Sequence, residues 1–306
     1  MCGEDVLRLL PVRIRCMVEK LKLDFSRLWE IRLRVNSPFI LRYEDSEIYV
    51  DSRGMKTDDA AKAYIVTARD VNDTLECVCN HSLYAYEDEI RQGFVTVCGG
   101  HRVGVAGKII LDGNRIKCIR HISFLNIRVA HEIKGCSNRV MQYIVSGGRL
   151  LNTLIVSAPC HGKTTLLRDI IRVVSNSGTT VGVVDERSEI AACYKGIPQN
   201  DVGIRTDVLD CCPKAAGMMM LVRTMAPELI AVDEIGGPAD VDAIFGGCRL
   251  LATAHGYSID DVRERTGIRR LVENRVFERY VVLGGEKAGQ VSDIFDGQGN
   301  RLCWCE

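Results

Sequence analysis

One short stretch of the chain combines the residue types that bind a polyphosphate. It reads Ser157-Ala158-Pro159-Cys160-His161-Gly162-Lys163-Thr164-Thr165 and lies between an apolar run at 150–156 and a helical run at 166–172. This order of strand, loop and helix is the context of a phosphate-binding P-loop, whose backbone N–H groups face the phosphates. Lys163 can then reach the β and γ oxygens, and the Thr164 hydroxyl can ligate Mg²⁺. The sequence therefore predicts a site for a nucleoside triphosphate.

The loop departs from the usual P-loop pattern at its first position. The pattern G-x-x-x-x-G-K-[ST] begins with glycine, and this chain has Ser157 there. Glycine adopts positive φ more easily than any other residue, so we expect the loop to turn without that freedom. If φ at Ser157 is positive, the resulting strain lowers nucleotide affinity.

Two further predicted strands end in pairs of acids. The apolar run 229–232 leads to Asp233 and Glu234, which is the layout of a Walker B element. The first acid of such an element holds Mg²⁺ directly or through water, and the second polarises the attacking water. The run 180–184 leads to Asp185 and Glu186. These acids either hold the water shell of the metal and orient the nucleophile, or cap a loop and form surface ion pairs.

Other polar residues follow the predicted strands. Thr253 and His255 come after the next strand and could sense the γ-phosphate, although His255 could also be a loop histidine with its hydrogen bonds satisfied. An arginine reaching across a subunit boundary could neutralise charge on the transferred phosphoryl group, and the candidates are Arg187, Arg205 and Arg223. The predicted catalytic set is Glu234, Asp185, Glu186, Lys163, His255 and Arg223, with Thr164 and Asp233 as metal ligands.

The elements that position these residues follow from periodicity. After residue 147, short β-branched runs at 150–156, 180–184, 229–232, 250–253 and 280–283 alternate with helical patterns. That alternation indicates βαβ units and a mostly parallel sheet whose strand C-termini meet at one edge. Before residue 146, helical runs at 6–10, 14–23 and 68–86 mix with β runs at 30–35, 38–42, 47–50 and 92–107, which indicates a smaller α+β domain. Gly147 and Gly148 mark the expected boundary, with domains at 1–146 and 147–306.

Composition excludes several classes of protein. The 306 residues are 46% hydrophobic and 26% charged with zero formal net charge, as in a globular protein without a global basic excess for nucleic acid. No apolar run approaches the roughly twenty residues of a membrane span, and residues 1–5 lack a signal-peptide layout, so we expect a cytoplasmic protein.

Three residue groups are expected to be structural. The fourteen cysteines include no C-x-x-C pair, and we expect them to be small buried hydrophobic residues without a metal site. The run Met218-Met219-Met220 is expected in a helix core. The arginine-rich region 259–279 is expected to be a solvated helical face with internal ion pairs.

Several motifs resemble those of the stage III sporulation protein AA family. They are Glu30-Ile-Arg-Leu-Arg-Val35, Ser82-Leu-Tyr-Ala-Tyr86, Gly93-Phe-Val-Thr-Val97, Gly99-Gly-His-Arg-Val-Gly104, Leu125-Asn-Ile-Arg-Val129, Val184-Asp-Glu-Arg-Ser-Glu-Ile190, Pro198-Gln-Asn-Asp-Val-Gly203, Thr206-Asp-Val-Leu-Asp210, Gly217-Met-Met-Met220 and Thr253-Ala-His-Gly256. The resemblance runs from about residue 28 to residue 283 and is more specific than the P-loop alone.

That resemblance implies a relative of the type II and type IV secretion ATPases, with a RecA-like P-loop core behind an N-terminal domain. It implies ATP and Mg²⁺ as cofactors, a hexameric homo-oligomer, and a cytoplasmic position at the forespore membrane through membrane proteins of a secretion-like channel complex. In the secretion relatives the catalytic glutamate follows a glycine, whereas here Asp233 precedes Glu234, so Glu234 is the catalytic candidate. Asp185, Glu186 and His255 match the acidic and histidine boxes of those relatives.

The segment between Asp242 and Thr253 is shorter than the corresponding helix of the family, which predicts a truncated element behind the acidic strand. Besides a motor, two other functions are open. One is a nucleotide-gated assembly scaffold with little turnover. The other is a RecA-like ATPase stimulated by nucleic acid, against which the zero net charge argues.

Overall fold

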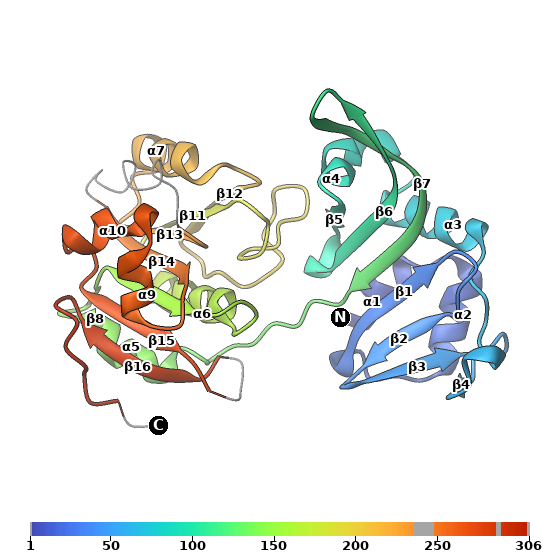
Figure 1. Cartoon of the computed structure of the whole chain (residues 1–306), viewed down its shortest axis with the longest axis horizontal. Helices are drawn as coiled ribbons and strands as arrows, with labels where there is room; N and C mark the ends of the chain where they lie inside the picture. The colour runs from blue at the N-terminus through green and yellow to red at the C-terminus, as the bar shows by residue number, and fades with distance from the viewer. Residues whose placement is uncertain (1, 236–247, 286–288, 305–306) are drawn as a thin grey trace. The chain divides into compact units, whose positions relative to one another are not determined.

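The computed structural model describes residues 2–235, 248–285 and 289–304 (Figure 1). The chain forms two compact units, Met1–His131 and Glu132–Glu306. The boundary predicted at residues 146 and 147 is therefore wrong. Helix α5 (Asn138–Ile144) buries Val140 and Ile144 in the core of the second unit. Gly147 and Gly148, at φ 58° and 77°, instead form the turn between the short strands β8 (Val145–Ser146) and β9 (Arg149–Leu150).

The first unit is an antiparallel sheet with helices. Its strand order is β4-β3-β2-β1-β7-β6-β5. The strands are β1 (Leu28–Arg34), β2 (Ile40–Tyr43), β3 (Ser46–Val50), β4 (Lys56–Thr57), β5 (Phe94–Thr96), β6 (Arg102–Asp112) and β7 (Arg115–Arg128), and the helices are α1 (Cys2–Arg8), α2 (Val12–Lys20), α3 (Ala68–Val78) and α4 (Glu87–Arg91). The alternation over residues 30–35 predicts that Ile31, Leu33 and Val35 face a core. Ile31 and Leu33 are buried, as is Leu28 at the start of β1, whereas Val35, just after the strand, is only half-buried.

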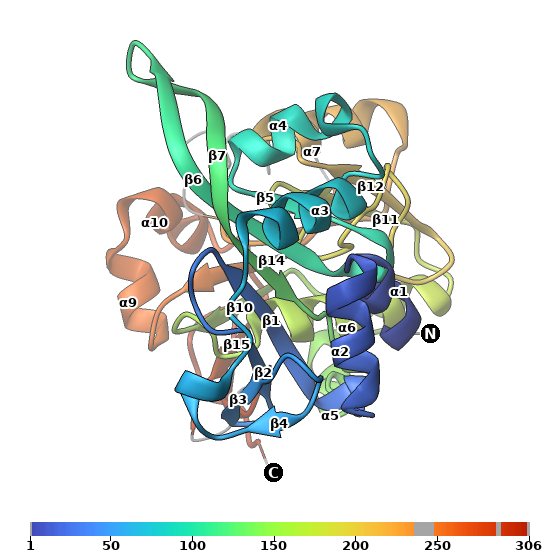
Figure 2. The same cartoon turned by 90° about the vertical axis from the view of Figure 1, so that its right-hand side faces the viewer.

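Two features of this unit were not predicted. The helical region expected at 68–86 ends at Val78, and a 3₁₀ turn and the short α4 follow it. Strand β7 was missed because its outer half, paired with β6 in a long hairpin, is mostly exposed and lacks a clear apolar alternation. Figure 2 shows this hairpin beside α3 and α4 of the same unit.

The second unit contains a mainly parallel sheet of order β12-β11-β13-β14-β10-β15-β16, in which only β16 runs antiparallel to its neighbour. Its strands are β10 (Thr153–Ser157), β11 (Val181–Asp185), β12 (Thr206–Asp210), β13 (Leu229–Val232), β14 (Arg249–His255), β15 (Arg279–Leu283) and β16 (Val291–Asp296). The five predicted strands are all present. The edge strands β12 and β16 were missed because they are half-exposed and rich in polar residues, so their sequences resemble loops.

Helices cover both faces of this sheet. They are α5, α6 (Lys163–Asn176), α7 (Lys214–Thr224), α9 (Ile259–Glu264) and α10 (Thr266–Glu273). One apolar cluster joins α5 and α6 to Ile155 of β10, and a second joins α7, α9 and α10 to Leu154 and Val156. Alternate residues of β10 thus enter opposite cores, so the polar residues concentrate where the strands end.

The structure corrects two expectations about packing. Met218 is buried as predicted, but Met219 and Met220 are 37% and 51% exposed, so the three do not share a helix core. Of the described cysteines only Cys79 and Cys193 are buried, whereas Cys16, Cys98, Cys160, Cys211 and Cys303 are exposed. The solvated arginine-rich face is confirmed by ion pairs between exposed side chains, such as Arg263 with Asp260 and Arg269 with Glu273. Within the described ranges, every helix is too short or too polar to cross a membrane.

The burial of His101 is expected to make the first unit sensitive to acid. Its side chain is 1% exposed, Nδ1 accepts a hydrogen bond from the Ala130 N–H at 3.0 Å, and burial lowers its pKa to about 4. Below the ordinary pKa of 6.5, His101 binds a proton in the unfolded state but stays neutral in the folded state. The free energy of unfolding therefore decreases as the pH falls from 6.5 towards 4.

We therefore expect His101→Asn to lose less stability than wild type between pH 7 and pH 5, by about 2 kcal/mol, because each pKa unit corresponds to roughly 1.4 kcal/mol. Urea unfolding followed by circular dichroism at the two pH values measures the difference. His81→Asn is the control, since that side chain is 77% exposed. Equal losses in wild type and His101→Asn would show that another group causes the acid sensitivity.

Candidate functional site

The P-loop turns at different residues from those expected. Ser157 is the last residue of β10, pairs in register with His255 of β14, and is fully buried in extended conformation. The positive φ angles of the loop occur at Cys160, 62°, and at Gly162, 85°. The predicted strain at Ser157 is therefore wrong, because the chain there is still a strand. Its hydroxyl donates to the Ala158 carbonyl at 2.9 Å.

Lys163 begins α6 and lies under the loop. Its Nζ is 3.2 Å from the Ala158 carbonyl oxygen and 3.1 Å from Nδ1 of His255. Burial lowers the pKa of Lys163, and the charges of Asp233 and Glu234 oppose that shift. Since a lysine ammonium only donates, Nδ1 of His255 must accept, which places the imidazole proton on Nε2.

Asp233 lies between two threonines. The Thr164 hydroxyl donates to Asp233 Oδ2 at 2.6 Å, and the Thr253 hydroxyl donates to Oδ1 of the same carboxylate. Thr253 is fully buried and its oxygen also accepts the Glu234 N–H at 2.9 Å. The predicted metal ligands, Thr164 and Asp233, are thus brought together, and a hydroxyl with a carboxylate is the hard oxygen donor set that suits Mg²⁺.

Both oxygens of Glu234 contact cationic or proton-donating side chains. Nε2 of His255 is 2.9 Å from Oε1, and Nη1 of Arg187 is 3.1 Å from Oε2. Glu234 follows β13 with φ 54°, which turns the chain immediately after the strand. His255 therefore bridges Lys163 and Glu234. Arg187, a predicted candidate for action across a subunit boundary, contacts Glu234 of its own chain.

The second acidic pair resolves into two different environments. Asp185 is 2% exposed and accepts the backbone N–H groups of Glu189, Ile190 and Ala191 at 2.8 to 2.9 Å. Burial raises its pKa to about 6, against the effect of those hydrogen bonds. Glu186 forms a 2.6 Å ion pair with Lys214. These are the contacts of the capped loop, yet both acids line one small cleft with Asp233 and Glu234.

The remaining predicted residues are placed as follows. His161 Nδ1 lies 2.8 Å from the Pro159 carbonyl oxygen, and the Thr165 carbonyl accepts a weak bond from Cys136 Sγ. Arg205 and Arg223 are exposed, before β12 and near the end of α7, and it is Arg187 that lines the cleft. The predicted truncation behind the acidic strand falls mostly on residues 242–247, outside the described residues, whereas β14 presents His255 at its end.

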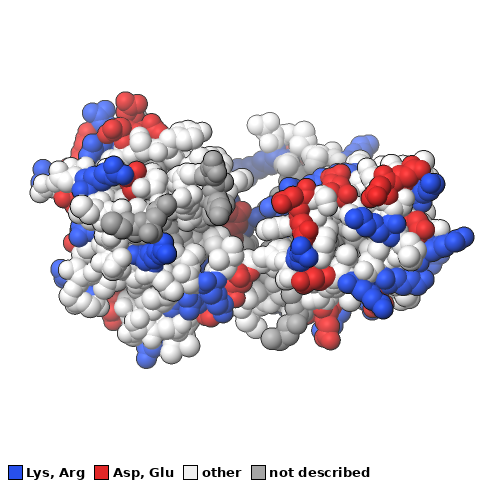
Figure 3. Space-filling view, turned by 90° about the horizontal axis from the view of Figure 1, so that it is seen from below, with Lys and Arg blue, Asp and Glu red and all other residues white. Residues whose placement is uncertain are grey.

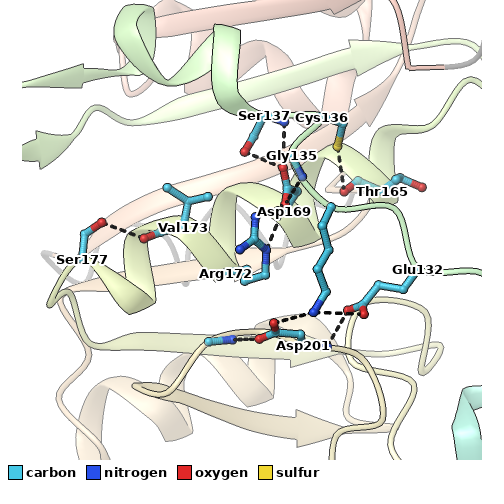
Figure 4. A network of polar contacts seen from close by, with 12 residues as sticks. Glu132, Gly135, Cys136, Ser137, Thr165, Asp169, Arg172, Val173, Ser177 and Asp201 are labelled. Atoms are coloured by element: carbon cyan, nitrogen blue, oxygen red, sulfur yellow. Dashed lines mark hydrogen bonds and ion pairs between the residues drawn. The ribbon is translucent and has the colours of Figure 1, made fainter. Parts of the chain in front are cut away.

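A buried carboxylate on α6 ties the start of the second unit to this site. Asp169 is 2% exposed and accepts from the Gly135 and Ser137 N–H groups at 3.0 and 2.8 Å, from the Ser137 hydroxyl at 2.7 Å, and from Arg172 (Figure 4). Together these donors hold the pKa of Asp169 at about 2, although burial opposes them. The segment that follows residue 131 is thereby attached to the helix that begins with Lys163.

Sequence reasoning missed Arg168. From α6 it donates through Nε to the Ile190 carbonyl and through Nη2 to the Glu189 carbonyl, each at 2.6 Å. The available signal was a charged residue inside the apolar pattern of the helical run 166–172. Its partners are backbone carbonyls, which every residue has, so the sequence does not identify them.

Comparison with known proteins finds matches over nearly the whole chain. A family model, Sporulation stage III, protein AA, matches residues 2–302. Stage III sporulation protein AA of Bacillus subtilis is 39% identical over 309 residues, covering 97% of this chain and 96% of that protein. The Arabidopsis thaliana protein SEEDLING PLASTID DEVELOPMENT 1 is 29% identical over 57% of this chain and 26% of its own.

Among solved structures, the Legionella pneumophila ATPase DotB matches with a TM-score of 0.54 and 15% identity, over 89% of this chain and 77% of that one. The chain therefore shares the fold of DotB.

Substitutions of Thr253 can test whether the site depends on the hydroxyl group of this residue or on the size of its side chain. We expect Thr253→Val to leave the Glu234 N–H and one Asp233 oxygen without a partner and to displace both acids. If the site hydrolyses a nucleotide, the rate should fall about 100-fold, as misplacement by an ångström can cause. Thr253→Ser keeps the hydroxyl and should stay within about fivefold of wild type, since it loses only a methyl group. Steady-state phosphate release measures both. Equal rates of phosphate release in Thr253→Val and wild type would show that the Thr253 hydroxyl does not position the two acids.

Proposed function

The chain belongs to the sporulation stage III, protein AA family, and from that premise we propose that it is an Mg²⁺-dependent ATPase with a RecA-like core that acts in endospore formation. The observation that carries the proposal is the meeting of four residues at one sheet edge. Lys163 and Thr164 start the helix after the P-loop, and Asp233 and Glu234 directly follow β13 beside them. This is the arrangement of a phosphoryl-transfer site.

Each residue has a separate task in this proposal. The backbone N–H groups of residues 160–164 surround the phosphates, and Lys163 exchanges its carbonyl partners for their oxygens. Thr164 and Asp233, the latter directly or through water, would hold Mg²⁺, which would neutralise charge on the transferred group. Glu234 accepts the proton of the attacking water. His255 turns towards the γ-phosphate when Lys163 leaves it, and so reports occupancy to Glu234.

We assign the first unit, Met1–His131, to contacts with membrane proteins of a channel complex, and the ATPase unit to a hexameric ring on the cytoplasmic side of the forespore membrane. The fold shared with an ATPase such as DotB supports the motor class. Basic and acidic residues are interspersed on the face shown in Figure 3. The zero formal net charge of the chain disfavours the nucleic-acid alternative.

One observation favours the scaffold as a second candidate. His255 contacts Oε1 of Glu234 and also Nζ of Lys163, which the P-loop carbonyls hold as well. The contact of His255 with Glu234 competes with a water molecule for that carboxylate oxygen. A scaffold would keep this contact after ATP binding, whereas a motor would break it.

We expect Glu234→Gln to bind ATP with wild-type affinity and to hydrolyse it at least 100-fold more slowly, because a general base contributes 10² to 10⁴ in rate. Lys163→Ala should lose both activities, since it removes the charge that meets the phosphates. Binding of a fluorescent ATP analogue and phosphate release measure the two steps. Glu228→Gln, an exposed acid just before β13, is the control and should match wild type.

Normal hydrolysis by Glu234→Gln would show that this residue is not the base. Tight ATP binding by the oligomeric wild type without phosphate release would replace the motor with the scaffold. Turnover that rises steeply with DNA and falls with salt would indicate the nucleic-acid ATPase.

A further inference from the structure

The loop after β11 is held from two sides by charged side chains, the buried Asp185 and the half-buried Arg168. From one side, Asp185 accepts the N–H groups of Glu189, Ile190 and Ala191. From the other, Arg168 donates to the carbonyl oxygens of Glu189 and Ile190, both at 2.6 Å. In this short segment the negative charge of Asp185 therefore fixes the N–H groups, and the positive charge of Arg168 fixes the carbonyl oxygens.

This attachment determines where the preceding residues of the loop lie. Ser188 has φ 53° and Ala192 has φ 49°, so the loop turns sharply on each side of the held segment. Between that segment and β11 lie Glu186, paired with Lys214, and Arg187, paired with Glu234 at 3.1 Å. The position of the Arg187 side chain thus depends on a loop that Arg168 holds in place.

Arg168 also connects the loop to helix α6. It lies on α6, the same helix whose first residues are Lys163 and Thr164. A planar guanidinium donating through two nitrogens fixes orientation as well as distance, which an ammonium cannot do. These two bonds therefore fix the position of the loop relative to the helix that carries Lys163 and Thr164.

We propose that Arg168 is a positioning residue for hydrolysis, which holds the loop 186–191 against α6 so that Arg187 reaches Glu234. Arg168 does not touch the nucleotide, and it acts through Arg187. This inference rests on the proposed ATPase function. It also assigns Arg187 to its own active site rather than to a neighbouring one.

The first test separates binding from catalysis in Arg168→Lys and Arg168→Gln. We expect both to bind ATP within threefold of wild type, because Lys163, Thr164 and Asp233 keep their contacts, and to lose about tenfold or more in kcat. Arg172→Gln, on the next turn of α6, is the matched control because Arg172 contacts Asp169 and not this loop. It should retain kcat even if the protein is less stable.

The second test combines Arg168→Gln with Arg187→Gln. If Arg168 acts through Arg187, the double variant should be within threefold of the slower single variant, whereas independent effects would multiply. Multiplication of the effects, or a loss of ATP affinity equal to the loss of kcat, would overturn the proposal. Arg168→Lys keeps the charge and most of the volume, so it remains informative if Arg168→Gln folds poorly.

Backbone amide exchange tests the attachment without turnover. In Arg168→Gln, and not in Arg172→Gln, the amides of Glu189, Ile190 and Ala191 should exchange at least tenfold faster than in wild type. Unchanged exchange would overturn the proposal whether or not the protein hydrolyses ATP. If wild type releases no phosphate, the proposed function fails, and the exchange measurement still decides whether Arg168 holds the loop.

Discussion

The hydrogen bonds that Asp233 accepts from two threonines are the interaction on which the site depends. Thr164 belongs to the first turn of α6, Asp233 to the end of β13, and Thr253 to β14, so one carboxylate joins three elements that are far apart in sequence. The Thr253 oxygen also holds the Glu234 N–H. Because the parallel ladder already aligns the ends of these strands, side-chain hydrogen bonds only have to set distances of a few ångströms.

Buried charge is the second constraint. Lys163, Asp169 and Asp185 are each less than 7% exposed, and burying an unpaired ion is unfavourable by several kcal/mol. Each is compensated differently. Asp185 accepts three backbone N–H groups, Asp169 accepts backbone and serine donors as well as Arg172, and Lys163 faces carbonyl oxygens and His255. Of these three residues, only Lys163 has partners that a phosphate can replace while every other buried charge keeps its partners. Lys163 is therefore the one of the three that is suited to contact a ligand.

Much of this site could be predicted from the sequence, because P-loops and acid-ended strands are local patterns and parallel strands bring their ends together. The residues Lys163, Thr164, Asp233, Glu234 and His255 meet as that reasoning requires. The failures have a common cause. The glycine pair at 147 and 148 looked like a linker because a hairpin turn uses the same residues, and Ser157 looked strained because sequence does not show where β10 ends. Arg168 was overlooked because its acceptors are main-chain oxygens.

Helix α6 therefore has a larger role than carrying the P-loop. Consecutive residues of an α-helix point about 100° apart, so Arg168 and Asp169 extend from different flanks of α6. One flank holds the loop that directs Arg187 towards Glu234, and the other holds residues 135–137, just after the first unit ends. Both attachments are charge-assisted, and that of Asp169 is buried, so they break less readily than surface contacts. A displacement of Lys163 and Thr164 along the axis of α6 would then act on both attached segments, the loop 186–191 and residues 135–137.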